Sequence, residues 1–414
     1  MATEVVTVLQ GKRILLGVCG SIAAYKAVDL ASKLTQAGAL VDVILTEAAE
    51  RFVTALTFQA VTGRPVYDSL WQSGGAALPT HIAHVGLGEG ADLLVVAPAT
   101  ANTLAKLAHG LADDLLSVTA LAARCPLLIA PAMDGGMYAH PAVQANLQTL
   151  TERGALLIEP DEGRFASGLV GRGRLPETPA LLGHIRRALG ASGVLRGRRV
   201  IVTAGGTREA IDPVRYLTNR SSGKQGYALA QAALDAGAAV TLVSSAALPT
   251  PTGAMLVAVN SAGEMLNAVL AHLPESDALL MAAAVADFRP QSAADHKIKK
   301  REGSDDAPTL VLTRTADILM TVKTQRATSG FPRVVVGFAA ESHDLLAYAA
   351  DKLARKGLDM LVANDISAPD AGFEVDTNRV VFLTPGGQEP LALTSKTRVA
   401  EALIERVAAL LAGR

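Results

Sequence analysis

Both halves of the chain open with the same pattern, an apolar run that leads directly into glycine. Residues 14–20 read Ile-Leu-Leu-Gly-Val-Cys-Gly, and residues 199–206 read Arg-Val-Ile-Val-Thr-Ala-Gly-Gly. After each opening, segments of helical periodicity alternate with further short apolar runs. Continuous apolar strands separated by helices are typical of a parallel sheet that helices cover on both faces. The pattern therefore predicts an α/β protein with two doubly wound, Rossmann-like or flavodoxin-like, parallel-sheet domains in tandem.

The predicted strands fall into two sets with a linker between them. Residues 190–197 (Gly-Ala-Ser-Gly-Val-Leu-Arg-Gly) have linker composition, which divides the chain into domains 1–190 and 191–414. The charged stretch 291–307 interrupts the second domain and is expected to be a long loop. The first set of strands is 13–19, 40–45, 92–97, 127–130 and 155–158, and the second continues from 199 with 239–244, 278–284, 334–338 and 360–363.

Charge and cysteine content exclude several classes of protein. The 414 residues carry 38 Lys and Arg against 39 Asp and Glu, which gives no overall positive field for nucleic acid or an anionic membrane. No apolar run approaches the roughly 20 residues of a membrane span, and the start lacks signal-peptide order. Two cysteines without a Cys-x-x-Cys make neither a disulfide framework nor a zinc ribbon. We expect a cytoplasmic protein.

Polar residues follow three predicted strands of the first domain. Gly20 and Ser21 come after the first strand and are expected to open a helix, and Thr46 follows the second strand. The third ends in Ala-Pro-Ala-Thr-Ala-Asn-Thr (97–103). Ligands of doubly wound sheets collect at these strand ends. Each signal alone is weak, since Gly20-Ser21 also suits a tight turn. Three together favour a phosphorylated planar cofactor.

The second domain has its own candidate anion site. A glycine-rich strand end at 203–209 includes Gly205, and Ser-Ser-Gly-Lys at 221–224 leads into the next predicted helix. Lysines 297, 299 and 300 on the charged loop, with Lys352 and Lys356 on one helix face, supply positive charge for a triphosphate. A solvated charge run is the alternative interpretation of these lysines. Neither glycine-rich turn carries a full dinucleotide fingerprint, which disfavours a generic NAD(P) dehydrogenase.

At these motifs the chain resembles two known families. Gly-Ser-Ile-Ala-Ala-Tyr-Lys (20–26), the 97–103 loop, His81-Ile and Pro-Ala-Met-Asp-Gly-Gly-Met-Tyr (131–138) resemble flavin-dependent phosphopantothenoylcysteine decarboxylases. Asp-Pro-Val-Arg-Tyr (212–216), Asn-Arg-Ser-Ser-Gly-Lys-Gln-Gly (219–226), Ala-Ala-Val-Ala-Asp-Phe (283–288) and Lys-Ile-Lys-Lys (297–300) resemble phosphopantothenate–cysteine ligases. In this order they resemble the bacterial bifunctional proteins of coenzyme A biosynthesis across nearly the whole chain.

The resemblance implies an FMN-dependent decarboxylase in the first domain, with His81 as the base. Flavin takes two electrons from the carbon that bears the thiol, carbon dioxide then leaves, and the electrons return to the enethiol. Histidine suits the proton removal because its pKa lies near neutrality. The alternative for His81 and His84 is a partly exposed pair on one helical turn. The implied FMN contacts are Gly20, Ser21, Thr46, Ala99, Thr100, Asn102, Thr103 and Met133.

Two residues depart from the commonest pattern of the decarboxylases. Asp134 stands where the family usually has Asn, which holds the substrate carboxylate. Ser167 stands where an Ala-Cys-Gly usually donates the final proton, and a hydroxyl is a far weaker acid than a thiol. We expect Asp134, as a neutral carboxylic acid in the substrate complex, to take over both the hydrogen bond and the proton donation.

The resemblance also implies that the second domain activates phosphopantothenate with CTP as an acyl-cytidylate. Lys297 would neutralise the developing charge, Asn219 would stabilise the intermediate, and Asp287 would contact the nucleotide or its Mg²⁺. Thr315-Ala316 replaces a more usual Asn-Pro. The implied CTP contacts are Gly205, Ser221, Ser222, Lys224, Ala282, Ala283, Asp287, Lys297, Ala316, Asp317, Ile318, Phe338, Lys352 and Lys356.

Three functional interpretations remain open from the sequence. The first is the bifunctional enzyme, acting on 4′-phosphopantothenate, cysteine and phosphopantothenoylcysteine. The second is a ligase whose flavin domain only binds FMN or stops at the oxidised enethiol. The third is a non-catalytic regulatory flavoprotein subunit. By family likeness we expect a homo-oligomer, with trimers of flavin domains and dimers of ligase domains that combine to a dodecamer.

Overall fold

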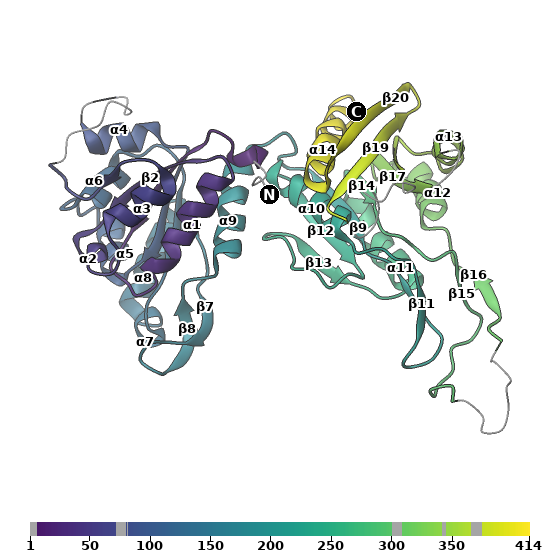
Figure 1. Cartoon of the computed structure of the whole chain (residues 1–414), viewed down its shortest axis with the longest axis horizontal. Helices are drawn as coiled ribbons and strands as arrows, with labels where there is room; N and C mark the ends of the chain where they lie inside the picture. Colours follow the sequence, from purple (N-terminus) through teal and green to yellow (C-terminus); the bar gives the residue numbers. More distant parts are fainter. Residues whose placement is uncertain (1–5, 72–79, 81, 300–308, 342–344, 366–374) are drawn as a thin grey trace. The chain divides into compact units, whose positions relative to one another are not determined.

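The chain divides into two units, Met1–Gly190 and Ala191–Arg414 (Figure 1). The computed structural model describes residues 6–71, 80, 82–299, 309–341, 345–365 and 375–414. Each unit is an α/β sandwich with a central sheet between two layers of helices. The predicted fold class, two doubly wound parallel-sheet domains in tandem, is confirmed.

A six-stranded parallel sheet forms the centre of the first unit, in the order β3-β2-β1-β4-β5-β6. β1 lies between β2 and β4, and Ile14 is in register with both Val41 and Leu93. The chain therefore reverses its winding direction between β1 and β4, and ligands of such sheets bind at that switch point. The strands are β1 (Arg13–Val18), β2 (Leu40–Leu45), β3 (Val66–Tyr67), β4 (Leu93–Ala99), β5 (Leu127–Pro131) and β6 (Leu156–Leu157).

Aliphatic side chains join the helices to both faces of this sheet. η1, α1, α3 and α9 pack on one face, and α4, α5, α6 and α8 pack on the other. A separate antiparallel hairpin, β7 (Asp161–Arg164) and β8 (Val170–Arg174), precedes α9. The helices are η1 (Thr7–Leu9), α1 (Ala24–Gln36), α2 (Glu47–Glu50), α3 (Ala55–Thr62), α4 (Ala83–Gly90), α5 (Ala101–His109), α6 (Leu115–Ala122), α7 (Gly135–Tyr138), α8 (Pro141–Glu152) and α9 (Thr178–Gly190).

The second unit has an eight-stranded sheet in the order β13-β12-β9-β14-β17-β18-β19-β20. The strands from β13 to β18 are parallel, and β19 and β20 extend the sheet in antiparallel fashion. The strands are β9 (Arg199–Ala204), β12 (Ala239–Ser244), β13 (Met255–Ala258), β14 (Ala278–Met281), β17 (Val334–Glu341), β18 (Met360–Asp365), β19 (Thr377–Thr384) and β20 (Gly387–Ser395). Two small ribbons are β10 (Arg208–Ala210) with β11 (Tyr216–Thr218), and β15 (Phe288–Pro290) with β16 (Leu312–Arg314).

Two helices cover one face of the second sheet and three cover the other. α10 (Lys224–Asp235) and α14 (Lys396–Ala412) share one aliphatic core. α11 (Ala262–His272), α12 (Ile318–Ser329) and α13 (Leu345–Lys356) share the other, next to η2 (Leu273–Glu275). No helix in the described ranges combines the length and the hydrophobicity that a membrane crossing requires.

The structure differs from the sequence prediction at one helix start and in several strands that were not predicted, among them β3, β13, β19, β20 and the small two-stranded ribbons. α1 begins at Ala24 and not at Gly20-Ser21, because the Ser21 hydroxyl accepts the N–H of Ala23 in a bend ahead of the helix. β20 was not predicted, since this edge strand is exposed along most of its length and so has no apolar run. The predicted long loop is irregular over 291–299, and its remainder, 300–307, lies outside the described residues.

Candidate functional site

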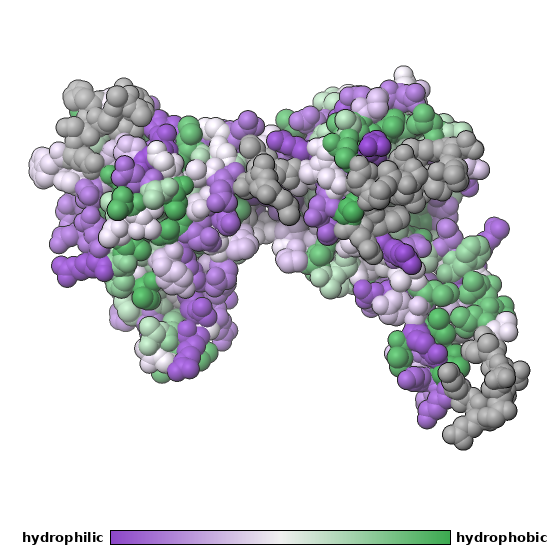
Figure 2. All heavy atoms as spheres, viewed as in Figure 1, coloured by the Kyte–Doolittle hydropathy of each residue, from purple (hydrophilic) through white to green (hydrophobic). Residues whose placement is uncertain are grey.

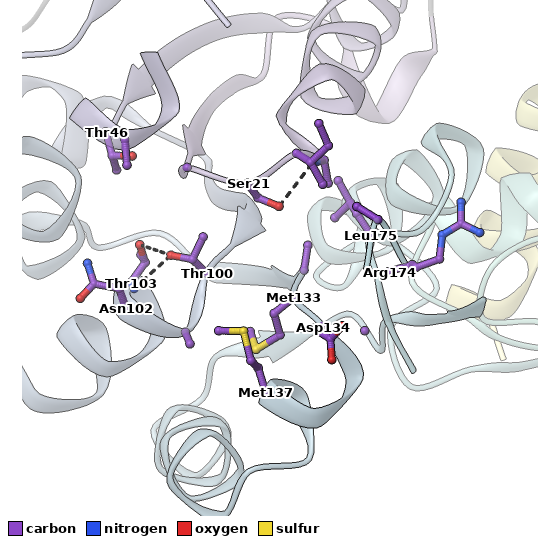
Figure 3. A pocket seen from close by; sticks show the side chains of 18 of the residues that line it. Ser21, Thr46, Thr100, Asn102, Thr103, Met133, Asp134, Met137, Arg174 and Leu175 are labelled. Carbon is purple, nitrogen blue, oxygen red and sulfur yellow. Dashed lines mark hydrogen bonds between the residues drawn. The ribbon is translucent and has the colours of Figure 1, made fainter. Parts of the chain in front are cut away.

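A cavity of about 980 Å³ lies at the carboxyl ends of the first unit's strands (Figure 3). Its volume is in the range of cofactor pockets. All the residues predicted to bind FMN line it except Ala99, whose side chain is buried in the core. The predicted residues along its wall are Gly20, Ser21, Thr46, Thr100, Asn102, Thr103 and Met133, together with Asp134 and Ser167.

One side of the cavity consists of a closely packed glycine turn and of threonine side chains that cap two helices. A Cβ on Gly20 would lie 2.4 Å from the Cβ of Ala48, so only glycine fits. Thr46 caps α2 by accepting the N–H of Ala49, and Thr100 caps α5 by accepting the N–H of Thr103. A glycine turn with free N–H groups and several hydroxyls suits a phosphate and a ribityl chain. The residues present fit FMN.

The opposite side joins α7 to the β7–β8 hairpin. Asp134 caps α7 by accepting the N–H of Gly136 at 3.1 Å, and Ser167 donates its hydroxyl proton to Asp134 Oδ2 at 2.8 Å. The ring of Phe165 packs against Gly135, where an added Cβ would lie 3.1 Å from the ring. The structure therefore brings together Asp134 and Ser167, which lie 33 positions apart in the sequence.

Several cavity residues carry charge that the sequence prediction missed. Lys26 donates to Glu177 at 2.7 Å and to the oxygen of Leu175, and Lys106 lies 2.7 Å from Asp113 and from Asp114. These pairs join residues by tertiary contacts for which no local motif exists. Arg164 and Met137 also line the cavity.

None of the histidines and cysteines in the described ranges lines this cavity. His81 lies outside the described residues, so its role stays a prediction, and His84 is half-buried on α4 and does not line the cavity. Burial raises the pKa of the Cys19 thiol to about 11, although Thr103 and Thr100 oppose this. Cys19 therefore stays protonated and inert at neutral pH.

In the second unit, two left-handed glycines bring the predicted anion nest against β9. Gly205 has φ +88° and Gly223 has φ +80°. A Cβ on Gly223 would lie 3.4 Å from the nitrogen of Gly205, so the two turns touch. Ser221 and Ser222 precede Gly223, and Lys224 starts α10.

The segment after β14 lies beside the same turn. Ala284 donates its N–H to the oxygen of Gly205, and Ala283 donates to Thr203 Oγ1 at 3.1 Å. Asn219 Nδ2 donates to the oxygens of Ala284 and Val285. Asn219, Gly205 and the predicted contacts Ala282 and Ala283 are therefore neighbours at the carboxyl end of the sheet.

Asp287 follows this segment and is exposed. The backbone oxygen of Asp287 accepts the N–H of Thr315. The next two predicted residues, Ala316 and Asp317, follow Thr315 in the sequence and therefore lie near Asp287. No cluster of three or more His, Cys, Asp or Glu side chains with metal-binding spacing occurs in the described part of the chain. The role of Asp287 toward Mg²⁺ stays a prediction.

Lys297 is placed by its neighbour Ile298. The N–H of Ile298 donates to Asp212 Oδ2 at 3.2 Å, and its oxygen accepts from Arg215 at 2.8 Å. Asp212 and Arg215 belong to the motif that resembles the ligases, and the structure indicates that this motif anchors the loop that carries Lys297.

The two lysines of α13 contact protein groups in the described structure. Lys352 donates to the backbone oxygen of Phe338 at 2.7 Å, and Lys356 forms an ion pair with Asp317 at 3.0 Å. Asp317 also caps α12 by accepting the N–H of Met320, and Ile318 is the first residue of that helix. The structure thus gathers these predicted CTP residues around β17 and α12, and their contact with phosphate stays a prediction.

Sequence reasoning missed one charged pair at this edge of the sheet. Lys224 donates to Asp376 at 2.6 Å, and Lys396 at the start of α14 is buried close to them. The only local signal was a helix start, at which Ser395 caps α14 by accepting the N–H of Arg398. Lys396, the first residue of this helix, belongs to no motif of its own.

Comparisons with known proteins cover both units. Residues 3–190 match the family model described as "Flavoprotein", and residues 195–411 match "DNA/pantothenate metabolism flavoprotein C-terminal domain". The chain is 47% identical over 407 residues to "Coenzyme A biosynthesis bifunctional protein CoaBC" of Bacillus subtilis, which covers 97% of this chain and 98% of that protein. It is 46% identical over 400 residues to the protein of the same name from Vibrio cholerae, covering 96% and 98%.

A solved structure matches the second unit. It is the C-terminal domain of a CoaBC protein, with 37% identity and a TM-score of 0.45, and the match covers 54% of this chain and 100% of that structure.

Proposed function

The chain belongs to the bifunctional proteins of coenzyme A biosynthesis, and from that membership we propose how its two sites share the reactions. The enzyme has decarboxylase and ligase activities. The observation that carries the proposal is the 47% identity across 97% of the chain, because it spans both units and both strand-end sites. The second unit joins 4′-phosphopantothenate to cysteine, and the first decarboxylates the product to 4′-phosphopantetheine.

In the ligase site, CTP activates the substrate carboxylate. A carboxylate oxygen attacks the α-phosphorus of CTP, pyrophosphate leaves, and an acyl-cytidylate forms. The cysteine amine then attacks the acyl carbon and loses a proton, CMP leaves, and the amide is formed. Lys297 offsets the negative charge of the first step, and Asn219 donates hydrogen bonds to the intermediate.

The nucleotide extends along the edge formed by β9, β14 and β17. Asp287 would hold the Mg²⁺ of the triphosphate, as a hard oxygen ligand for a hard cation. The backbone of Ala282, Ala283 and Ala316 to Ile318 surrounds the nucleoside, beside Phe338. Lys352 and Lys356 supply positive charge next to these groups. The phosphate oxygens are bound by Gly205, Ser221, Ser222 and Lys224.

In the decarboxylase site, FMN would be held in the 980 Å³ cavity by Gly20, Ser21, Thr46, the 99–103 loop and Met133. Bound FMN supplies a reversible two-electron oxidation of the substrate. His81 removes a proton from the substrate before the oxidation. Asp134 hydrogen-bonds the substrate carboxylate and later donates a proton to the enethiol, and Ser167 orients Asp134 through their 2.8 Å hydrogen bond.

A second candidate is a flavin site that stops at the oxidised enethiol. The observation that favours it is the pair Asp134 and Ser167 in place of an amide and a thiol. In this candidate the ligase is unchanged and only the final reduction is missing.

Exposed apolar side chains favour a homo-oligomer, with ligase units pairing. Phe288, Val311 and Leu312 on or next to the β15–β16 ribbon are 49%, 62% and 47% exposed, and Figure 2 shows apolar surface along this ribbon. We expect trimers of flavin units and dimers of ligase units, combined in a dodecamer. A native mass measurement that gives a monomer would contradict this. The cytoplasmic location stays a prediction.

The test is a single incubation of the purified yellow protein with 4′-phosphopantothenate, cysteine, CTP and Mg²⁺, with mass analysis of all products. The proposal expects pyrophosphate, CMP, carbon dioxide and 4′-phosphopantetheine. A product two hydrogens lighter supports the second candidate. Absence of pyrophosphate would contradict the ligase and leave a regulatory flavoprotein.

A further inference from the structure

Two helices of the ligase unit begin side by side, each with a lysine as its first residue. Lys224 starts α10, and Lys396 starts α14. Gln225 Nε2 donates to the backbone oxygen of Lys396 at 3.2 Å, which fixes the two first turns next to each other. The positive ends of two helix dipoles therefore meet where two ammonium groups also lie.

Lys396 is buried to an extent that is rare for a lysine. Only 6% of the residue is exposed, whereas its neighbour Asp376, which accepts from Lys224 Nζ at 2.6 Å, has an 86% exposed side chain. Burial, and then the nearby charge of Lys224, lower the pKa of Lys396 to about 8, against the opposing effect of Asp376. The folded chain therefore holds a buried ammonium group beside a second one, which destabilises the charged form.

A buried amide adjoins the same two turns. Asn378, 3% exposed, donates from Nδ2 to Gln225 Oε1 at 3.4 Å, and its Oδ1 has no hydrogen-bond partner in the described structure. Thr377 pairs with Ser395 across β19 and β20, which puts this group at the carboxyl edge of the sheet. Gly205 and Asn219 lie at the same edge, so a ligand here belongs to the ligase site.

We propose that Lys396 and Lys224, with the first turns of α10 and α14, form a subsite for a phosphate group of a ligase substrate. A phosphate carries up to two negative charges and several acceptor oxygens, which match two ammonium groups at the positive ends of two helix dipoles. The subsite rests on the proposed ligase activity. Its phosphate comes either from the CTP triphosphate or from the 4′-phosphate of phosphopantothenate, which share this chemistry.

The experiment compares Lys396→Met, Lys396→Arg and the control Lys323→Met in the full-length protein. Lys323 lies on α12 and donates to the backbone oxygen of Arg355, away from the subsite. KM is measured separately for CTP and for phosphopantothenate, and inhibition is measured with inorganic pyrophosphate. Thermal unfolding is recorded for each variant.

Loss of one charge-assisted contact predicts a rise of about tenfold or more in one KM for Lys396→Met, partial recovery in Lys396→Arg, and no change in Lys323→Met. A rise in KM for CTP with weaker pyrophosphate inhibition assigns the subsite to the triphosphate, and a rise for phosphopantothenate assigns it to the 4′-phosphate. The melting temperature of Lys396→Met should stay level or increase, because a buried charge is removed.

Two results would overturn the subsite. One is an unchanged pair of KM values in Lys396→Met with wild-type pyrophosphate inhibition. The other is a lowered melting temperature with equal loss in all kinetic values, which indicates a purely structural lysine. If the wild-type protein releases no pyrophosphate at all, the proposed ligase itself has failed, and this outcome is visible before any variant is made.

Discussion

Arg215 follows Asp212 by three residues, and its Nε donates to Asp212 Oδ2 at 2.9 Å. The two side chains together bind both backbone polar groups of Ile298, because Asp212 accepts its N–H and Arg215 donates to its oxygen. Asp212 is buried and also accepts the N–H groups of Val214 and Arg215, each at 2.8 Å. The Arg215 guanidinium and then these N–H groups hold the pKa of Asp212 well below its usual range. Lys297 is thus attached to the fold through an ion pair that stays charged down to strongly acidic pH.

The first prediction is that Arg215→Ala slows ligation without touching decarboxylation. Without the guanidinium, Ile298 loses its oxygen contact and Asp212 loses its counter-ion, so Lys297 is less well placed. We expect kcat for ligation to fall about tenfold or more. Hydrogen exchange at 296–299 should quicken in parallel. The control Arg198→Ala breaks the 2.9 Å pair with Asp277 elsewhere in the unit and should leave both readouts near wild type. Normal exchange with slow ligation would contradict the positioning role.

The second prediction separates the two activities. Lys297→Ala and Asn219→Ala should each abolish ligation, because they remove the charge and the hydrogen bonds that we propose for the acyl-cytidylate. Both should still decarboxylate supplied phosphopantothenoylcysteine at the wild-type rate, since the cavity proposed to bind FMN lies in the other unit. Assay of the two half-reactions on one preparation checks this. If either variant lost both reactions, the division into two sites would be wrong.

A third prediction concerns the turn after β1. Gly20→Ala places a methyl group 2.4 Å from the Cβ of Ala48, so the turn must move. We expect the purified variant to lose most of its yellow colour and to bind added FMN at least tenfold more weakly. Gly63→Ala is the matched control, because no atom lies within 4 Å of its added methyl. Its positive φ should cost about 1 kcal/mol of stability, with FMN binding unchanged. Full FMN content in Gly20→Ala would show that this turn does not contact the cofactor.

The parallel strands of both units were predictable because buried parallel strands are apolar along their whole length. Contacts that depend on tertiary structure were not. Ser167 lies on a polar hairpin, and only the fold brings it to Asp134. Lys396 resembles any lysine at a helix start until α10 packs beside it. The order of residues predicts which strand ends are polar, whereas distances across the sheet decide which polar groups meet.

The fourth prediction is a pH dependence of stability that belongs to Lys396. Its pKa in the folded chain is lowered from 10.5 to about 8, so between these values the unfolded chain binds more protons than the folded chain. The free energy of unfolding should therefore gain a favourable contribution as pH rises from 8 toward 10.5, and this contribution is absent at lower pH. Burial is the largest cause of this shift; of the two charged groups that face Lys396, Lys224 lowers its pKa further and Asp376 opposes the shift. Denaturant unfolding of wild type and Lys396→Met at pH 7 to 10 should show the gain only in the wild type. Parallel profiles would contradict it.

The last prediction addresses Asp134 as the proton donor of the flavin site. In the structure both of its oxygens act as acceptors, Oδ1 from the N–H of Gly136 and Oδ2 from the Ser167 hydroxyl. When a substrate carboxylate binds beside Asp134, a second negative charge there is unfavourable, so Asp134 takes up a proton. This proton first forms a hydrogen bond to the substrate carboxylate and is later donated to the enethiol. Asp134→Asn keeps the hydrogen bond and loses the acid. Under anaerobic conditions it should release carbon dioxide in one turnover and accumulate the enethiol, two hydrogens lighter than the full product. Ser167→Ala should still reach the full product with only a small loss of rate, because the hydroxyl contacts Asp134 and does not itself supply the proton. If Asp134→Asn forms the fully reduced product as fast as the wild type, the proton comes from another donor such as water.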